Sequence, residues 1–177
     1  MKVAVTTPTG NIGSVVTDKL LAAGADVTLL VRDPGKVKAF ADRGAKAVAG
    51  SLDDAEYVTL ATRGADCLFW LTPPNYAAPD FRGYQNEVGR CAAAAVKSNG
   101  ISRVVHLSSL GAHLDSGTGP ILGLRDIEGM FADTGAHVTN LRPGMFMENH
   151  LMSLPTILEA GSVFLPVPGT LRANFIA

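Results

Sequence analysis

Hydrophobic residues occur along this chain in two alternating patterns. Short, nearly continuous runs of Val, Leu and Ala are separated by longer segments in which hydrophobic residues recur every three or four positions. The first pattern is typical of β-strands and the second of amphipathic α-helices. We therefore expect strands at residues 2–6, 26–32, 46–50, 66–72, 103–109 and 137–142. Helices are expected near residues 12–23, 35–43, 54–63, 80–99 and 122–134.

Most of the expected strands are too hydrophobic to have one face in water. Strands with hydrophobic side chains on both faces are typical of a parallel sheet that is covered by helices. Strands that alternate with helices, joined by right-handed crossovers, give a doubly wound sheet. The pattern therefore predicts an α/β fold in three layers, with a mostly parallel sheet between two layers of helices. In such folds, ligands bind outside the carboxyl ends of the strands.

The composition supports one sizeable core and excludes several functional classes. The chain has 177 residues, of which 47% are hydrophobic, which suits one main domain. Its 15 basic and 16 acidic residues nearly cancel, so a surface for nucleic acid or for a membrane is not expected. Hydrophobic runs stay shorter than the ~18 residues of a membrane span, and the first expected strand leaves no room for a signal peptide. We therefore expect a cytoplasmic protein.

The cysteines and histidines give little indication of redox or metal chemistry. Cys67 lies in a hydrophobic run and Cys91 in an alanine-rich segment, so we expect two buried, reduced thiols, with a disulfide as the alternative. The four histidines are scattered without the spacing of metal ligands, and no metal site is expected.

A glycine-containing turn, VTTPTGNIGS at residues 5–14, follows the first expected strand. The N-terminus of a helix presents unpaired N–H groups and a partial positive charge, both of which suit a phosphate group. Glycine lets a phosphate approach closely, and Gly10 and Gly13 stand where that approach would occur, with Asn11 placed to cap the helix. Two glycines alone fit an ordinary tight turn equally well.

Six sequence elements taken together resemble one family. VTTPTGNIGS is similar to the TGATGxxG fingerprint of the atypical short-chain dehydrogenases, in particular the NmrA-like group, with Thr7 at the position of the first glycine. The other elements follow along nearly the whole chain: LLVRDPGKV, GSLDD, LFWLTPP, VVHLSSLGA and LRPGMFMEN. The resemblance implies a Rossmann fold, with a dinucleotide-binding domain over residues 1–142. It also implies that residues 143–177 begin a small substrate-binding region, which a C-terminal truncation leaves incomplete.

The resemblance further implies a set of residues that bind a nicotinamide dinucleotide. Those of the phosphate-binding turn are Thr6, Thr9, Gly10, Asn11, Ile12 and Gly13. Thr72 and Pro73, at the end of the fourth strand, would border the nicotinamide ribose. Pro143 would meet the nicotinamide amide, although an RPG sequence is also a common turn after a strand. Asp53 would lie near the adenine, or would instead cap the helix expected to begin at Asp54.

The residue that ends the second strand indicates which dinucleotide binds. An acidic residue there binds the ribose of NAD, whereas arginine pairs with the 2′-phosphate of NADP. Arg32 occupies this position and Lys36 follows closely, so we expect NADP(H) to be preferred over NAD(H). Asp33 is expected to cap the next helix, because Pro34 suits the first position of a helix; an approach to the ribose is the alternative.

The acid–base pair that is common in this superfamily is missing. Such dehydrogenases use a Tyr-x-x-x-Lys pair, in which the lysine lowers the tyrosine pKa from about 10. None of the three tyrosines is followed by lysine four residues later. The remaining candidates for catalysis are Ser109, which would orient a carbonyl group, and Arg125, which would supply positive charge beside the nicotinamide. The alternative for Arg125 is an ordinary surface ion pair with Glu128.

The missing pair bears on the choice of substrate. Reduction of a ketone produces a basic alkoxide, whereas reduction of a quinone produces a phenolate-like anion whose conjugate acid has a pKa of about 10. A quinone therefore needs less help from a proton donor. We expect an NADPH-dependent oxidoreductase that transfers hydride to a quinone-like or other conjugated small molecule. The alternative is a non-catalytic protein that senses NADP(H) and acts through a protein partner; a homodimer is compatible with both.

Overall fold

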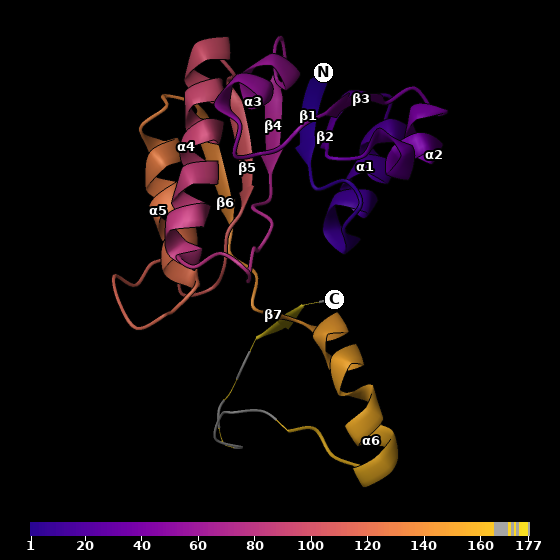
Figure 1. Ribbon diagram of the computed structural model, residues 1–177, viewed down its shortest axis with the longest axis vertical. Helices are drawn as coiled ribbons and strands as arrows, with labels where there is room; N and C mark the ends of the chain where they lie inside the picture. The colour runs from indigo at the N-terminus through magenta and orange to yellow at the C-terminus, as the bar shows by residue number, and fades with distance from the viewer. Residues whose placement is uncertain (165–169, 171, 173, 177) are drawn as a thin grey trace.

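The computed structural model describes residues 1–164, 170, 172 and 174–176, and its centre is a six-stranded parallel sheet (Figure 1). The strands are β1 (Lys2–Thr6), β2 (Asp26–Val31), β3 (Lys46–Ala49), β4 (Cys67–Trp70), β5 (Arg103–Leu107) and β6 (His137–Leu141). They lie in the order β3-β2-β1-β4-β5-β6, and every neighbouring pair is parallel. The chain thus builds the sheet outward from β1 in both directions, which confirms the expected doubly wound topology.

Helices cover both faces of the sheet, which confirms the three expected layers (Figure 1). The helices on one face are α3 (Ala55–Ala61), α4 (Phe81–Asn99) and α5 (Ile121–Ala132). Those on the other are α1 (Asn11–Ala22), the 3-10 helix η1 (Pro34–Val37) and the short helix α2 (Lys38–Ala41). Successive side chains of a strand point to opposite faces, so each strand serves both layers. In β1, Ala4 packs toward α3–α5, whereas Val3 and Val5 pack toward α1.

The expectation that strands are buried on both faces holds for the centre of the sheet and is wrong at its edges. Strands β1, β2 and β4 are almost entirely buried. In β3 and β6 no residue is fully buried, because each has a neighbouring strand on only one side. The fourth and fifth strands also end two residues earlier than expected, at Trp70 and Leu107.

Aspartates cap three of the helices that follow strands. Asp33 Oδ1 accepts a hydrogen bond of 2.9 Å from the Gly35 N–H at the start of η1, which confirms its expected capping role. Asp54 caps α3, so this helix begins one residue later than expected and the capping alternative for Asp53 is wrong. Asp80 caps α4 by accepting a hydrogen bond from a backbone N–H of its first turn. These caps satisfy backbone N–H groups that would otherwise lack partners.

Both cysteines are buried and free, as expected. Burial raises the pKa of Cys67 and of Cys91, so both thiols are held in the protonated form. Within the described residues, no helix is long and apolar enough to cross a membrane. Across the same part of the chain, His, Cys, Asp and Glu form no group of three that could hold a metal ion.

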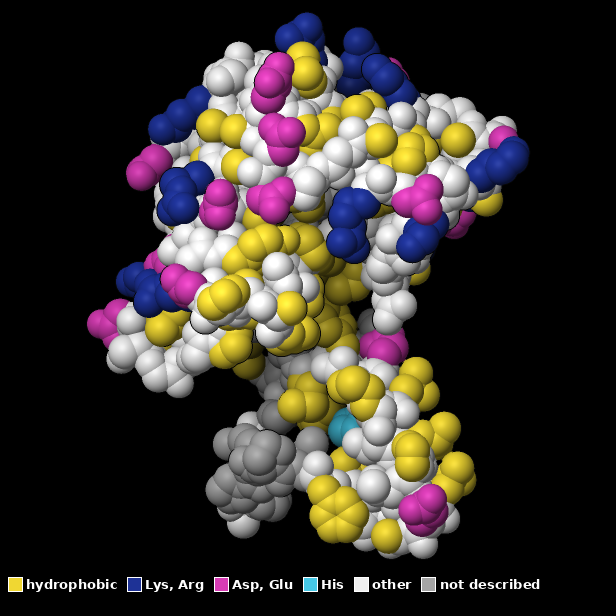
Figure 2. Space-filling model, viewed as in Figure 1, with side chains coloured by type: hydrophobic (Ala, Val, Ile, Leu, Met, Phe, Trp, Pro, Cys, Tyr) yellow, Lys and Arg dark blue, Asp and Glu magenta, His cyan; other side chains and the backbone are white. Residues whose placement is uncertain are grey.

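The described residues after 144 lie beyond the carboxyl edge of the sheet (Figure 1). Their elements are β7 (Met145–Phe146), the 3-10 helix η2 (Met147–Ser153), α6 (Leu154–Ala160) and β8 (Phe175–Ile176), with β7 and β8 paired in parallel. Many of their large apolar side chains are exposed, among them Met152 and Leu158 (Figure 2). The division at residue 142 remains a prediction, and residues 165–169, 171, 173 and 177 of the expected substrate-binding region lie outside the described residues.

Candidate cofactor site

A cavity of about 890 Å³ opens at the carboxyl edge of the sheet, where β1 and β4 are neighbours. The helix after β1 packs on one face and the helix after β4 on the other, so the two connections diverge and leave a crevice. The volume is in the range of small-molecule and cofactor sites. The cavity is lined by residues 7–12, residues 30–33 with Lys36, residues 50–52, residues 71 and 73–75, and Tyr84.

The N-terminus of α1 is open toward this cavity. Gly10 is the N-cap residue, no side chain caps the helix, and its first turn has no acidic residue. The Gly10 carbonyl accepts the first helical hydrogen bond, 2.9 Å from the Ser14 N–H, so Asn11 is the first residue of the helix and the expectation that Asn11 caps it is wrong. Gly10, Asn11 and Ile12 all line the cavity. The uncapped N–H groups of this turn therefore suit a diphosphate.

The turn before α1 contains a threonine in a backbone conformation that is usual for glycine. Thr7 has a φ of +50°, a left-handed conformation that β-branched residues rarely adopt. Its carbonyl oxygen accepts a hydrogen bond of 3.0 Å from the Gly10 N–H. Gly13 does not line the cavity but lets α1 pack closely against the turn, because a Cβ at this position would stand 2.1 Å from the Thr7 carbonyl oxygen. The buried Thr7 hydroxyl has no hydrogen-bond partner within the described residues.

Thr6 and Thr72 hold the walls of the crevice rather than lining it. The Leu71 N–H donates to Thr6 Oγ1 over 2.8 Å, and this hydroxyl lies 3.1 Å from the Leu71 carbonyl oxygen, so β1 is fastened to the end of β4. Thr72 Oγ1 accepts a hydrogen bond of 2.9 Å from the Trp70 indole N–H. Both threonines are buried, whereas Pro73 lines the cavity.

The segment after β2 adds two cations and one acid, Asp33, to the cavity lining. Arg32 and Lys36 are exposed and line the cavity, and neither forms an ion pair within the described residues. Asp53 is exposed and lies outside the lining, whereas Ser51 and Leu52 from the same turn belong to it. The residues of this edge thus fit a phosphorylated dinucleotide, with helix N–H groups at one end and two cations along the wall.

Two tyrosines lie near the cavity, and neither has a lysine beside it in the sequence. The Tyr57 hydroxyl donates to the Val48 carbonyl oxygen over 2.8 Å, and burial raises the pKa of Tyr57 to about 12. Gly50 is required beside it, because a Cβ there would lie 2.2 Å from the Tyr57 ring. Tyr84 on α4 lines the cavity, and burial together with the Asp53 carboxylate raises its pKa. Both phenols are therefore neutral at neutral pH.

The surface ion pair considered for Arg125 does not form. Arg125 is exposed on α5, and Glu128 pairs instead with Arg142, whose Nε donates to Glu128 Oε1 over 2.9 Å while its Nη2 donates to Oε2. The Arg142 guanidinium meets the carboxylate with two parallel N–H groups, the bidentate arrangement typical of strong arginine–carboxylate pairs. Although burial acts to raise the pKa of Glu128, the hydrogen bonds from Arg142 hold it below its ordinary value.

The Glu128–Arg142 pair fixes the segment that contains Pro143. Arg142 directly precedes Pro143, and the Pro143 carbonyl oxygen accepts a hydrogen bond of 2.9 Å from the Leu110 N–H. The ends of β5 and β6 are thereby joined. Ser109 lies between them in a half-buried position, and its hydroxyl makes only a 3.3 Å contact with the Leu110 carbonyl oxygen. Ser109, Arg125 and Pro143 lie outside the lining of the large cavity.

Several lining residues were missed in the sequence. Ser51 and Leu52 belong to the GSLDD element, in which the sequence pattern indicated only Asp53. Pro74 and Asn75 directly continue the Thr-Pro pair that was chosen. For Tyr84 the sequence offers no clear signal, because its place at the cavity depends on how α4 packs across the sheet.

Three features define a dinucleotide-binding protein of the Rossmann class. They are the doubly wound parallel sheet, the uncapped helix α1 at the crevice between β1 and β4, and the two cations in the cavity lining. The family model described as NAD(P)H-binding matches residues 8–153. The chain therefore belongs to this NAD(P)H-binding family, which confirms the fold and the type of cofactor that the sequence resemblance implied.

Two curated relatives are similar to nearly the whole chain. The NAD(P)H azoreductase of Xenophilus azovorans is 31% identical over 159 residues, which cover 90% of this chain and 53% of the relative. Quinone oxidoreductase 2 of Escherichia coli is 32% identical over 175 residues, which cover 94% of this chain and 56% of the relative. The chain thus spans about half the length of the curated relatives that it matches.

Solved structures show the same fold. The NADPH-dependent quinone oxidoreductase of Escherichia coli in complex with NADPH superimposes with a TM-score of 0.75 at 27% identity, covering 90% of this chain and 54% of that one. The triphenylmethane reductase of Citrobacter sp. in complex with NADP(H) gives a TM-score of 0.78 at 20% identity, covering 92% of this chain and 56% of that one.

Proposed function

We propose that this chain is the NADPH-binding part of an oxidoreductase that transfers hydride to quinone-like or other conjugated small molecules. The observation that carries the proposal is the combination, in one cavity, of the uncapped α1 N-terminus with the side chains of Arg32 and Lys36, which form no ion pair in the part of the chain that the structure describes. The names of the relatives, an azoreductase and a quinone oxidoreductase, support the same class of acceptor.

Each end of the cavity would hold a different part of the cofactor. The N–H groups of Asn11 and Ile12 would bind the diphosphate. Arg32 and Lys36 would bind the 2′-phosphate, which discriminates NADPH from NADH. Pro73 would border the nicotinamide ribose. When bound, NADPH supplies the hydride.

The groups around the nicotinamide end would orient the acceptor rather than protonate it. Tyr57 lies beside β3, away from that end, and keeps its proton, because its pKa is about 12 and its hydroxyl is committed to Val48. Ser109, at the end of β5, would donate a hydrogen bond to an acceptor oxygen, and the exposed Arg125 would supply positive charge to the reduced anion. A phenolate-like product with a pKa of about 10 takes its proton from water at neutral pH.

The choice of cofactor is tested by Arg32→Asp, with Arg63→Asp as the matched control. Arg63 is an exposed arginine at the opposite, amino edge of β4, so it undergoes the same change of charge away from the cavity. Loss of the charge-assisted hydrogen bonds should weaken NADPH binding by about 10- to 100-fold in a calorimetric titration and leave NADH affinity nearly unchanged. Equal NADPH affinities in Arg32→Asp and the unmodified chain would exclude this role for Arg32.

Rapid mixing of the NADPH-loaded protein with a panel of quinones tests the activity. Loss of the reduced-nicotinamide absorbance is the expected result. Tight NADPH binding without turnover of any acceptor would instead favour a sensor of NADP(H) that acts through a protein partner, the reading that the missing Tyr-x-x-x-Lys pair supports. Sedimentation with and without NADPH would show whether the protein forms a homodimer in either case.

A further inference from the structure

A second, smaller cavity lies beside the nicotinamide end of the proposed cofactor site. It has a volume of about 330 Å³ and is lined by Tyr76, Phe81, Arg82, Gly119 and Pro120; we name it the Tyr76 pocket. Its residues come from the connections that follow β4 and β5, two neighbouring strands whose carboxyl ends share one edge. Residues 73–75 line the large cavity, and Tyr76, the next residue along, lines the Tyr76 pocket.

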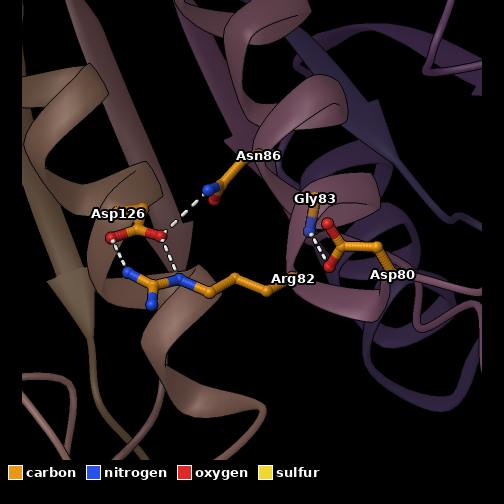
Figure 3. Close-up of polar contacts among 5 residues, drawn as sticks. All are labelled: Asp80, Arg82, Gly83, Asn86 and Asp126. Carbon is orange, nitrogen blue, oxygen red and sulfur yellow. Dashed lines mark hydrogen bonds and ion pairs between the residues drawn. The ribbon is translucent and has the colours of Figure 1, made fainter.

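The floor of the Tyr76 pocket is an aromatic pair. The rings of Tyr76 and Phe81 are stacked, with centroids 5.4 Å apart and planes inclined by 18°. Phe81 is the first residue of α4, and Asp80 fixes this helix end by accepting a hydrogen bond of 2.8 Å from the Gly83 N–H (Figure 3). The Tyr76 side chain is nevertheless 84% exposed, so one face of its ring remains free for another flat group.

The cationic side of the Tyr76 pocket is held in place and already neutralised. Arg82 reaches from α4 to Asp126 on α5, with Nε 2.7 Å from Oδ2 and Nη2 2.9 Å from Oδ1 (Figure 3). The Asn86 amide donates to the same carboxylate over 3.0 Å. Because Asp126 balances the charge of Arg82, the pocket has little attraction for an anion. Its lining contains no acidic residue to attract a cation.

The other two lining residues are small and apolar. Gly119 has a positive φ of 55° and no side chain, and the Pro120 ring follows it at the start of α5. Aromatic faces, a proline ring and a bare glycine backbone form a slot that suits a planar, uncharged ring. A larger or charged occupant would leave this surface imperfectly matched.

We propose that the Tyr76 pocket binds the planar, uncharged aromatic or quinonoid ring of the electron acceptor by stacking it on Tyr76. The inference rests on the proposed function, since it assigns the acceptor of that same site. It adds a residue and a class of ligand: Tyr76 recognises a flat ring, while the large cavity holds the dinucleotide. Arg82 is a positioning residue that fixes α4 against α5 beneath the ring.

Binding without reaction tests the proposal directly. The probe is 2,3-dimethyl-1,4-naphthoquinone, whose blocked ring positions prevent addition to thiols, and the protein is saturated with NADP⁺, which has no hydride to transfer. Equilibrium dialysis should show that Tyr76→Ala weakens binding of the probe by about tenfold, while Tyr76→Phe keeps nearly full affinity. Leu60→Ala on α3, which removes a half-exposed apolar side chain far along the fold, should have no effect.

The outcomes separate this proposal from the proposed function. Equal affinity of the probe for Tyr76→Ala and the unmodified protein, or no binding at all, would refute the proposal that the Tyr76 pocket binds the acceptor ring. This would hold even if NADPH turnover were found with other acceptors. Tyr76-dependent binding without turnover would support the Tyr76 pocket and count against the oxidoreductase. The circular-dichroism spectrum and the NADP⁺ affinity of Tyr76→Ala should match those of the unmodified protein, because Tyr76 is exposed and lies outside the cofactor lining.

Discussion

The buried histidine beneath the carboxyl edge provides a sharp test of the structure. His106 on β5 has no exposed surface, and its ring packs edge-on against Phe131 with centroids 5.4 Å apart. Its Nδ1 lies 3.1 Å from Asn140 Oδ1, so the neutral ring donates this hydrogen bond. Burial lowers the pKa of His106 from 6.5 to about 4, against smaller opposing effects of Asn140 and Glu128.

The lowered pKa makes the protein less stable in mild acid. The folded protein resists protonation of His106, whereas the unfolded chain accepts a proton at its ordinary pKa. The stabilising contribution is therefore present above pH ~6.5 and is lost as the pH falls toward ~4. With one pKa unit equal to about 1.4 kcal/mol, a difference of about 2.5 units removes about 2 kcal/mol from the free energy of unfolding between about pH 7 and pH 5.

Reversible urea unfolding of the unmodified chain and of His106→Gln, at both pH values, measures this loss. Glutamine does not titrate and can still donate a hydrogen bond to Asn140. It lacks the ring that packs against Phe131, so the variant should be the less stable one at pH ~7. The difference should shrink by about 2 kcal/mol at pH ~5, because the carboxylates titrate alike in both proteins. His137→Gln, at an exposed position of β6, is the control and should leave the pH dependence unchanged. A stability difference that stays constant with pH would refute the neutral, buried His106.

Two further predictions concern the backbone turns around the cofactor site. Thr7→Gly should raise the free energy of unfolding by about 1 kcal/mol, because relief of the positive φ and loss of an unpartnered hydroxyl outweigh the entropy of glycine in the unfolded chain. Thermal melts would show this, and a lowered melting temperature would contradict the strain. Glu128→Gln should weaken binding of NADP⁺ severalfold and leave binding of 2′,5′-ADP unchanged, because Arg142 and Pro143 would face only the nicotinamide half. If calorimetry showed equal losses of affinity for NADP⁺ and for 2′,5′-ADP, the Glu128–Arg142 pair would not act through the nicotinamide half.

The parts of the fold that follow from local chemistry were predictable from the sequence. The hydrophobic runs indicated all six strands of the main sheet, and their near lack of polar residues indicated parallel pairing. Asp33 followed by Pro34 is a local cap signal, and the structure has that cap. The glycine-containing turn at residues 5–14 was a local signal, because its strand, its glycines and the start of its helix follow one another directly in the sequence.

Features that depend on distant partners were not predictable. The spacing of Arg125 and Glu128 fits a helical pair, but the sequence could not show that Arg142, at the far end of β6, would reach the same carboxylate. The position of Asn11 within the helix was equally hidden, because Gly10 and Asn11 are both good N-cap residues and only the path of the Thr7 turn decides between them. Sequence spacing thus indicates which side chains are close along the chain, but it does not indicate which residue from a distant element will be the actual partner.

The contrast among successive helix starts supports a ligand at the first of them. After β2, β3 and β4, the chain supplies Asp33, Asp54 and Asp80 to the backbone N–H groups. After β1, it supplies no side chain, and it adds at Thr7 a conformation that costs about 1 kcal/mol or more. The helix after β5, α5, also lacks a side-chain cap, so α1 is set apart by the combination of an open helix end with the strained Thr7. An open helix end that lines the cavity and a strained residue beside it fit an anion at this position, as the diphosphate of the proposed cofactor would supply.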